Sequence, residues 1–219
     1  MVVDAVNIFL HTPRRMINKA RNYHHGDLRA ALLSEAAEMI AEGGTQSLTM
    51  RAISARLGVS RAAPYRHFPD KSSLLCAVAA AGFERLTLRL RSIEAAARRP
   101  SAEQFRRMGE EYVHFAIENP AHYRLMYGKE ALARESVPQL REAADGLLDF
   151  LIAVIRAQQR GGGIKRQNPR TLAYAAWGAV HGLASLMIEG QIDPTVDADR
   201  LIRQTTRTLL EGFRSRRRE

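Results

Sequence analysis

Cysteine is almost absent from this chain. Cys76 is the single cysteine among 219 residues, so the chain cannot form an internal disulfide or a zinc finger built on cysteine ligands. With 46% hydrophobic residues, a chain of this length can bury a core without such cross-links. This composition is typical of a protein from a reducing compartment.

We expect neither a membrane-spanning hydrophobic run nor a signal peptide in this chain. We expect Arg or Asp to interrupt every apolar stretch before it is long enough to cross a bilayer. The first ten residues contain Asp4 and lack a basic start, and Pro13, Arg14 and Arg15 stand where a signal peptide would have small residues. We therefore expect a cytoplasmic protein with no membrane partner.

Acidic residues are outnumbered by basic ones. The chain has 33 Lys and Arg against 23 Asp and Glu, for a net charge of +10 at pH 7. Such an excess makes a polyanion a reasonable partner. Charge alone does not separate nucleic acid from an anionic membrane surface.

Strand-like alternation of apolar and polar residues is missing, whereas apolar residues recur at helical spacing throughout. We therefore predict an all-α fold. The first helix should begin near Leu28 and end at Gly43 and Gly44. Capping residues, prolines and glycines indicate where the other helices lie. One of them should begin at residue 120 and another should follow Pro138 and end at 160. The rest are expected at residues 50–57, 61–68, 71–93, 102–118, 169–189 and 198–213.

Gly58, Val59 and Ser60 separate two of the short helices. Gly58 favours the left-handed conformation that ends a helix, and Ser60 should cap the next one. A tight turn here sets the second helix at a steep angle, as in a DNA-binding helix-turn-helix. We expect Val59 to be the buried anchor of the turn, with Ile53 and Leu57 facing the core.

The second of these helices, residues 61–68, has few large apolar residues at its start and many hydrogen-bond donors. The donors are Arg61, Tyr65, Arg66 and His67, and Lys71 follows. Such groups suit phosphates and base edges. Each residue alone would also suit a solvated polar helix, but the ordered set after the turn favours DNA binding.

Residues 23–86 resemble the DNA-binding domain of TetR-family transcriptional regulators. The resemblance rests on TMRAI at 49–53, LGVSRAAPYRHFPDK at 57–71 and LL at 74–75. It implies a phosphate at the helix N-terminus beside Thr49. Further phosphate contacts are implied for Ser60, Tyr65, His67 and Lys71, and base contacts for Arg61, Ala62 and Arg66. Arg61 can bond guanine in a bidentate way, and Phe68 should lie in the core.

Pro64 departs from what many members of the family have at this position. A proline four residues after the expected cap removes a backbone hydrogen bond and crowds Ser60. We therefore expect the recognition helix to start as a tighter or bent turn, which affects the assignment of base contacts more than the groove-binding mode.

Trp177, His181 and Gly182 match a Trp-x-x-x-His-Gly signature of one branch of the family. The resemblance implies a C-terminal bundle that binds a small-molecule effector and pairs its last two helices across a two-fold axis. Trp177 and His181 share a helix face and either line a pocket or pack the core or dimer seam, and helical spacing favours packing. The full set of candidate ligand residues is Tyr112, Phe115, Met126, Trp177 and His181.

The resulting organisation is a basic arm at residues 1–22, a helix-turn-helix domain at 23–69, a connecting helix at 70–99 and an effector-binding and dimerisation domain at 100–219. The arm either reaches a minor groove or is disordered. We expect the whole protein to be a homodimeric repressor that an effector releases from a palindromic DNA operator. The main alternative is a sequence-indifferent architectural DNA-binding protein.

Enzyme function is not expected. A helical-bundle enzyme would need a nucleophile with its base, paired carboxylates or a metal cluster. His24 and His25 are adjacent, so on a helix they point to different faces, and no cysteine or carboxylate completes a site with them. No cofactor and no metal are therefore expected.

Overall fold

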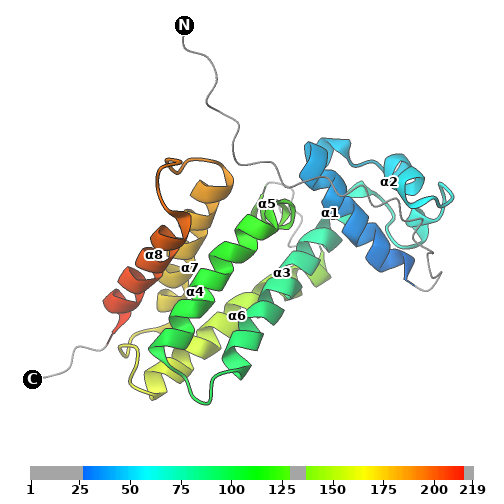
Figure 1. Ribbon diagram of the computed structural model, residues 1–219. Helices are drawn as coiled ribbons and strands as arrows, with labels where there is room; N and C mark the ends of the chain where they lie inside the picture. Colours follow the sequence, from blue (N-terminus) through cyan, green and yellow to red (C-terminus); the bar gives the residue numbers. More distant parts are fainter. Residues whose placement is uncertain (1–26, 129–136, 215–219) are drawn as a thin grey trace, which may run out of the picture.

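The computed structural model describes residues 27–128 and 137–214, and all regular structure in these ranges is helical (Figure 1). The predicted all-α fold is confirmed. The basic arm, the pair His24 and His25 and the arginines after residue 214 lie outside the described residues. The elements are α1 (Leu28–Ser47), α2 (Met50–Leu57), the 3-10 helix η1 (Pro64–Arg66), α3 (Lys71–Ala95), α4 (Ala102–Glu118), α5 (Pro120–Tyr127), α6 (Pro138–Arg160), α7 (Pro169–Ile188) and α8 (Ala198–Phe213).

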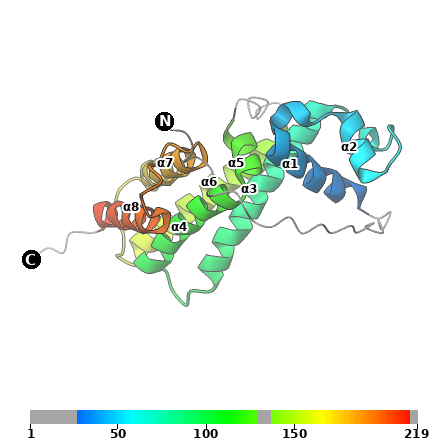
Figure 2. The ribbon, with the colours of Figure 1, turned by 45° about the horizontal axis from the view of Figure 1, so that its top comes forward.

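Helix α3 joins the two parts of the molecule. Figures 1 and 2 show α1 and α2 at one end of α3, with α4, α5 and α6 packed along the rest of it and α7 and α8 on the far side of α4. Leu74 and Val78 of α3 are fully buried near α1, and Phe83 and Leu86 are buried farther along. Because α5 also packs against α1, the two parts touch directly as well as through α3.

Most of the predicted helix starts are correct in their capping chemistry. Asp70 accepts a hydrogen bond from the Ser73 N–H at 2.7 Å, and Asp197 accepts one from Arg200. Ser101 and Gln104 form the predicted capping box. Each such cap stabilises a helix by about 1 kcal/mol, so the sequence itself specifies where these helices begin.

Asn119 is an exception and corrects the prediction for α5. Its side chain does not cap α5. The Asn119 amide instead donates to the Phe115 carbonyl at 3.0 Å, at the carboxyl end of α4. Pro120 alone, with its fixed φ, marks the first turn of α5.

The predicted end of the first helix is also close to correct. Gly43 and Gly44 leave helical geometry, and Gly44 has a φ of 69°, which glycine adopts at little cost. Helical turns nevertheless continue to Ser47, whose hydroxyl donates to the carbonyls of Met39 and Gly44 at 2.8 Å. These bonds hold the segment that leads into α2.

The expectation about apolar runs was wrong for α7. No Asp, Glu, Lys or Arg lies between Arg170 and Glu189, and among the described residues α7 is the one helix long and apolar enough to cross a membrane. Length and composition alone are weak grounds for a span, because the core helix of a bundle passes the same test. In this structure α7 packs against α4, α6 and α8, and 33% of its apolar window is buried.

Candidate nucleic-acid interface and effector cavity

Helix α2 and the turn after it have the geometry of a helix-turn-helix. The Thr49 hydroxyl caps α2 by accepting the Ala52 N–H at 3.0 Å. Gly58 ends α2 with a φ of 65°, as predicted, and the Val59 N–H donates to the Ser54 carbonyl at 3.0 Å. Val59 is only half-buried, so it is not the fully buried anchor that we expected. The residue buried at this end of α2 is Ser54, at 1% exposed.

Residues 61–68, which we call the recognition segment, form a series of tight turns and not the predicted α-helix. The Ala63 N–H donates to the Ser60 carbonyl at 3.0 Å, and the His67 N–H donates to the Pro64 carbonyl at 3.0 Å. Such three-residue spacing is that of a 3-10 turn. Pro64 has no N–H to continue an α-helix, so the predicted tightening at this residue is correct. The Ser60 side chain has no hydrogen-bond partner among the described residues, so the predicted cap is absent.

Two buried side chains fix this segment to the rest of the domain. Pro64 is buried, and Phe68 is 4% exposed beneath the Arg29 guanidinium, which lies 5.5 Å from the ring centroid. Phe68 is therefore a core residue, as predicted. These anchors leave the side chains between them free to face outward.

Arg56 ties α2 to α1. Its guanidinium makes an ion pair with Glu35 and hydrogen-bonds Glu42 at 2.6 Å. The hydrogen bond from Arg56 lowers the pKa of Glu42 below its ordinary value. An exposed pair contributes little to stability alone, but three charges in one network restrict how α2 can rotate on α1.

The residues predicted to contact DNA are almost all exposed. They are Thr49, Ser60, Arg61, Ala62, Tyr65, Arg66 and His67. Tyr65 is 53% exposed, an unusual fraction for an aromatic side chain without a partner surface. Seven predicted contact residues thus lie at three exposed places: the N-terminus of α2, the stretch 60–62 before Pro64, and the stretch 65–67 between Pro64 and Phe68.

Lys71 differs from the others. It is half-buried at the start of α3, and its ammonium donates to the Thr45 carbonyl at 2.6 Å. The structure thus gives Lys71 a second role that the sequence did not suggest, which is to hold the segment before α2 against the start of α3. Its phosphate contact stays a prediction.

Comparison with known proteins identifies the family. The model for bacterial regulatory proteins of the tetR family matches residues 32–78, and the model for the tetracyclin repressor-like C-terminal domain matches residues 105–209. The chain belongs to the TetR family. Its all-α fold, with an N-terminal helix-turn-helix and a C-terminal helical domain, is that of TetR regulators, which are generally not enzymes.

Solved structures of the same fold extend over most of the chain. A protein of unknown function from Rhodococcus sp. RHA1 is 32% identical, with 89% of this chain and 100% of that chain covered and a TM-score of 0.78. A TetR-family regulator from Pectobacterium atrosepticum is 26% identical over 87% of this chain and 95% of that chain, with a TM-score of 0.66. A TetR/AcrR regulator from Thermobifida fusca, 22% identical over 86% of this chain and 100% of that chain, shares the fold with a TM-score of 0.66. No curated protein matches the chain.

The C-terminal domain encloses a cavity of about 180 Å³. Its wall comes from α3, α4, α6, α7 and α8, with Tyr127 from the end of α5. Of the five candidate ligand residues, Tyr112 and Trp177 line it. His181 lies behind them, hydrogen-bonded to Tyr112 through Nδ1 at 3.3 Å.

Phe115 and Met126 do not line the cavity. Phe115 is fully buried under the Arg89 guanidinium, which lies 5.6 Å from the ring centroid. Met126 is 1% exposed and lies against Gly82 of α3. Both side chains are core residues.

A chain of hydrogen bonds joins the cavity wall to α5. The Trp177 indole N–H donates to the Tyr112 hydroxyl at 3.0 Å, and the Tyr112 and Tyr123 hydroxyls lie 3.2 Å apart. The Tyr123 hydroxyl lies 2.6 Å from Nδ1 of His181. Burial raises the pKa of Tyr123 to about 12 and lowers the pKa of His181, so both groups are neutral at pH 7.

Trp177 therefore lines the cavity and packs the core at once, so the two roles left open by the sequence are not exclusive. Tyr123 was missed by the sequence reasoning. The signal that could have found it is its spacing, because Tyr123 lies one helical turn before Tyr127 in an aromatic-rich segment. Its ring stacks on His181 with centroids 5.5 Å apart.

Proposed function

We propose that this protein is a homodimeric transcriptional repressor that binds a palindromic DNA operator and leaves it when a small molecule occupies the cavity. The observation that carries this proposal is the exposed, donor-rich segment 60–67, which Pro64 and Phe68 anchor behind the Gly58 turn. We place Thr49, Ser60, Tyr65, His67 and Lys71 at phosphates and Arg61, Ala62 and Arg66 at bases. The protein would act in the cytoplasm, where its operator lies.

Pairing of two copies would match the symmetry of such an operator. The apolar helix α7 carries Leu186 on its outer side, 48% exposed, which supports the last two helices as the dimer surface. Two recognition segments must then lie about 34–36 Å apart to reach successive major grooves on one side of the duplex.

Release by a ligand would act through α3. This helix begins at Lys71, directly after the recognition segment, and Phe83 and Leu90 of the same helix line the cavity. A ligand that moves α3 would change the separation of the two recognition segments. A coupling free energy of about 1–3 kcal/mol is typical of such linkage and weakens DNA binding roughly 5- to 150-fold.

Selection of bound duplexes from a random pool, followed by footprinting, tests the proposal. We expect a discrete palindromic site whose half-sites are about 10 base pairs apart from centre to centre, bound by a dimer in sedimentation measurements. A monomer without preference among duplexes at physiological salt would instead indicate the architectural alternative.

A further inference from the structure

We propose that the cavity takes a lipophilic amine, protonated at neutral pH, as its ligand. This inference rests on the proposed effector role of the cavity and adds the chemical class of the effector. Three observations lead to it. The wall is mostly apolar and aromatic, the Arg106, Trp177 and Thr206 donors of the wall already bond protein acceptors, and a carboxylate at its edge makes no ion pair or hydrogen bond within the described residues.

The size and lining of the cavity suit one aromatic ring with a short chain. Its volume of about 180 Å³ slightly exceeds that of an engineered protein cavity of roughly 150 Å³ that admits benzene. Apolar side chains surround it, among them Leu90, Phe105, Met108, Leu147 and Leu151. A ligand must therefore be mostly apolar to replace water there favourably.

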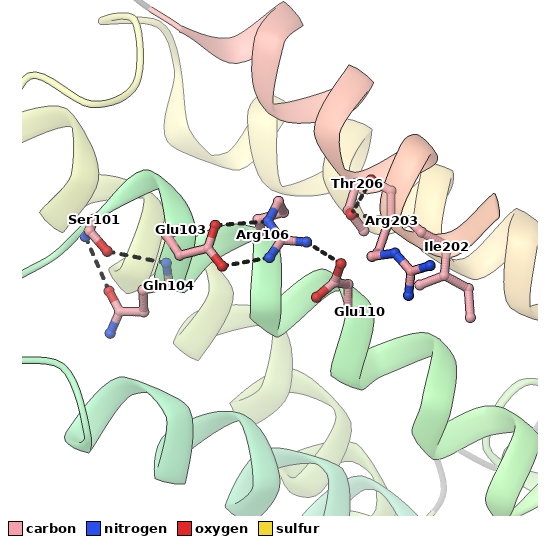
Figure 3. Close-up of polar contacts among 8 residues, drawn as sticks. All are labelled: Ser101, Glu103, Gln104, Arg106, Glu110, Ile202, Arg203 and Thr206. Carbon is pink, nitrogen blue, oxygen red and sulfur yellow. Dashed lines mark hydrogen bonds and ion pairs between the residues drawn. The ribbon is translucent and has the colours of Figure 1, made fainter. Parts of the chain in front are cut away.

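Arg106 is the one basic residue of the wall in the part of the chain that the structure describes, and two carboxylates already pair with it. Its Nε donates to Glu103 at 2.9 Å, and its guanidinium also bonds Glu110. Figure 3 shows the Arg106 side chain lying between these two carboxylates. A ligand carboxylate would have to displace one of them, so the cavity disfavours an anion.

Two neutral donors of the wall, Trp177 and Thr206, are used as well. The Trp177 N–H bonds Tyr112, and the Thr206 hydroxyl donates to the Ile202 carbonyl at 3.0 Å. The Tyr112 proton is directed toward Tyr123 and His181, because a phenol is a stronger donor than a neutral imidazole and Nδ1 of His181 is the terminal acceptor of the chain. The hydroxyl oxygens of Tyr112 and Thr206 can therefore only accept a hydrogen bond from a ligand.

Asp145 of α6 supplies a charge of the right sign. It is exposed, contributes to the cavity wall, and makes no ion pair or hydrogen bond within residues 27–128 and 137–214. Tyr174 and Trp177 of the neighbouring helix α7 line the same cavity, with ring centroids 6.1 Å apart. Aromatic faces and a carboxylate both attract a cation, and an ammonium group brings charged donors for the Asp145 carboxylate.

Calorimetric titration of the full-length protein with three probes of matched size tests the inference: 2-phenylethylamine, 2-phenylethanol and phenylacetate. We expect the amine to bind about tenfold more tightly than the alcohol and phenylacetate to bind most weakly. Asp145→Asn should reduce the advantage of the amine to within about threefold. Asp149→Asn removes the same charge one helical turn farther along α6, outside this cavity, and should keep that advantage.

Phenylacetate binding as tightly as the amine would overturn the inference. So would an unchanged amine preference in Asp145→Asn, or no binding of any probe. Selection of operator DNA without a probe is a separate measurement. If amine binding is found but no operator is selected, the proposed function fails while the ligand class stands, and the reverse result removes only the ligand class.

Discussion

Gly82 of α3 lies so close to Met126 of α5 that a Cβ at this position would be 2.7 Å from the Met126 Sδ and 3.0 Å from its Cγ. The Cβ of His122, one turn earlier in α5, would be 3.2 Å away. Because α5 also packs against α1, the crossing at Gly82 lies next to the contact between the C-terminal bundle and the N-terminal helices.

Gly82→Ala should therefore lower the free energy of unfolding. A methyl group gains about 1 kcal/mol in helix propensity, but overpacking a full core costs about 1–3 kcal/mol, and Met126 is fully buried. Gly146→Ala in α6 is the matched control, since a Cβ there meets nothing within 4 Å, and it should raise stability. Denaturant unfolding measures both. Equal stabilisation by the two variants would show that the Met126 side chain can move away from the new methyl group without lowering the free energy of unfolding.

Arg61→Ala should relax the sequence preference of DNA binding. A bidentate contact from arginine to guanine is worth about 1–3 kcal/mol of discrimination, so the variant should bind selected and scrambled duplexes more equally. Lys71→Ala should instead weaken all duplexes alike and reduce the salt slope by about 1. Fluorescence anisotropy at several salt concentrations separates the two effects. A preserved preference in Arg61→Ala would move base reading to Arg66 or another residue.

Much of this fold follows from local chemistry that is visible in the sequence. The caps at Asp70 and Ser101 and the left-handed glycine at Gly58 depend on residues within four positions of each other, so a single sequence specifies them. The family resemblance adds the ordered pattern of residues 49–75. Together these features predicted the helices, the helix-turn-helix and their order.

The cavity could not be predicted in the same way. Its wall combines side chains of six helices, from α3 to α8, and Phe115 and Tyr112, one turn apart on α4, face different surroundings because of what packs against them. The role of Lys71 at the Thr45 carbonyl was hidden for the same reason, since 26 residues separate the two. Tertiary packing decides such contacts, and no local pattern records it.

Thr49 should matter for stability and for DNA binding in separable ways. Its hydroxyl caps α2 by accepting the Ala52 N–H, so Thr49→Ala should lower the free energy of unfolding by about 1 kcal/mol and also weaken DNA binding. Thr49→Ser retains the hydroxyl and should keep both properties near wild type. Unfolding and anisotropy titrations are the measurements, and loss of stability with unchanged DNA affinity would leave Thr49 as a cap alone.

His122 should make the stability of the protein depend on pH. Burial, with a smaller contribution from Arg85, lowers the pKa of His122 from 6.5 to about 4. Between these values the unfolded chain binds more protons than the folded one. The stability contribution is therefore fully present above about pH 6.5 and is lost as the pH falls toward about 4. His122→Gln removes this titration, so its unfolding free energy should fall less than that of the wild type between pH 7 and pH 4. Parallel curves for the two proteins over that range would mean that His122 is protonated in the folded state as readily as in the unfolded chain.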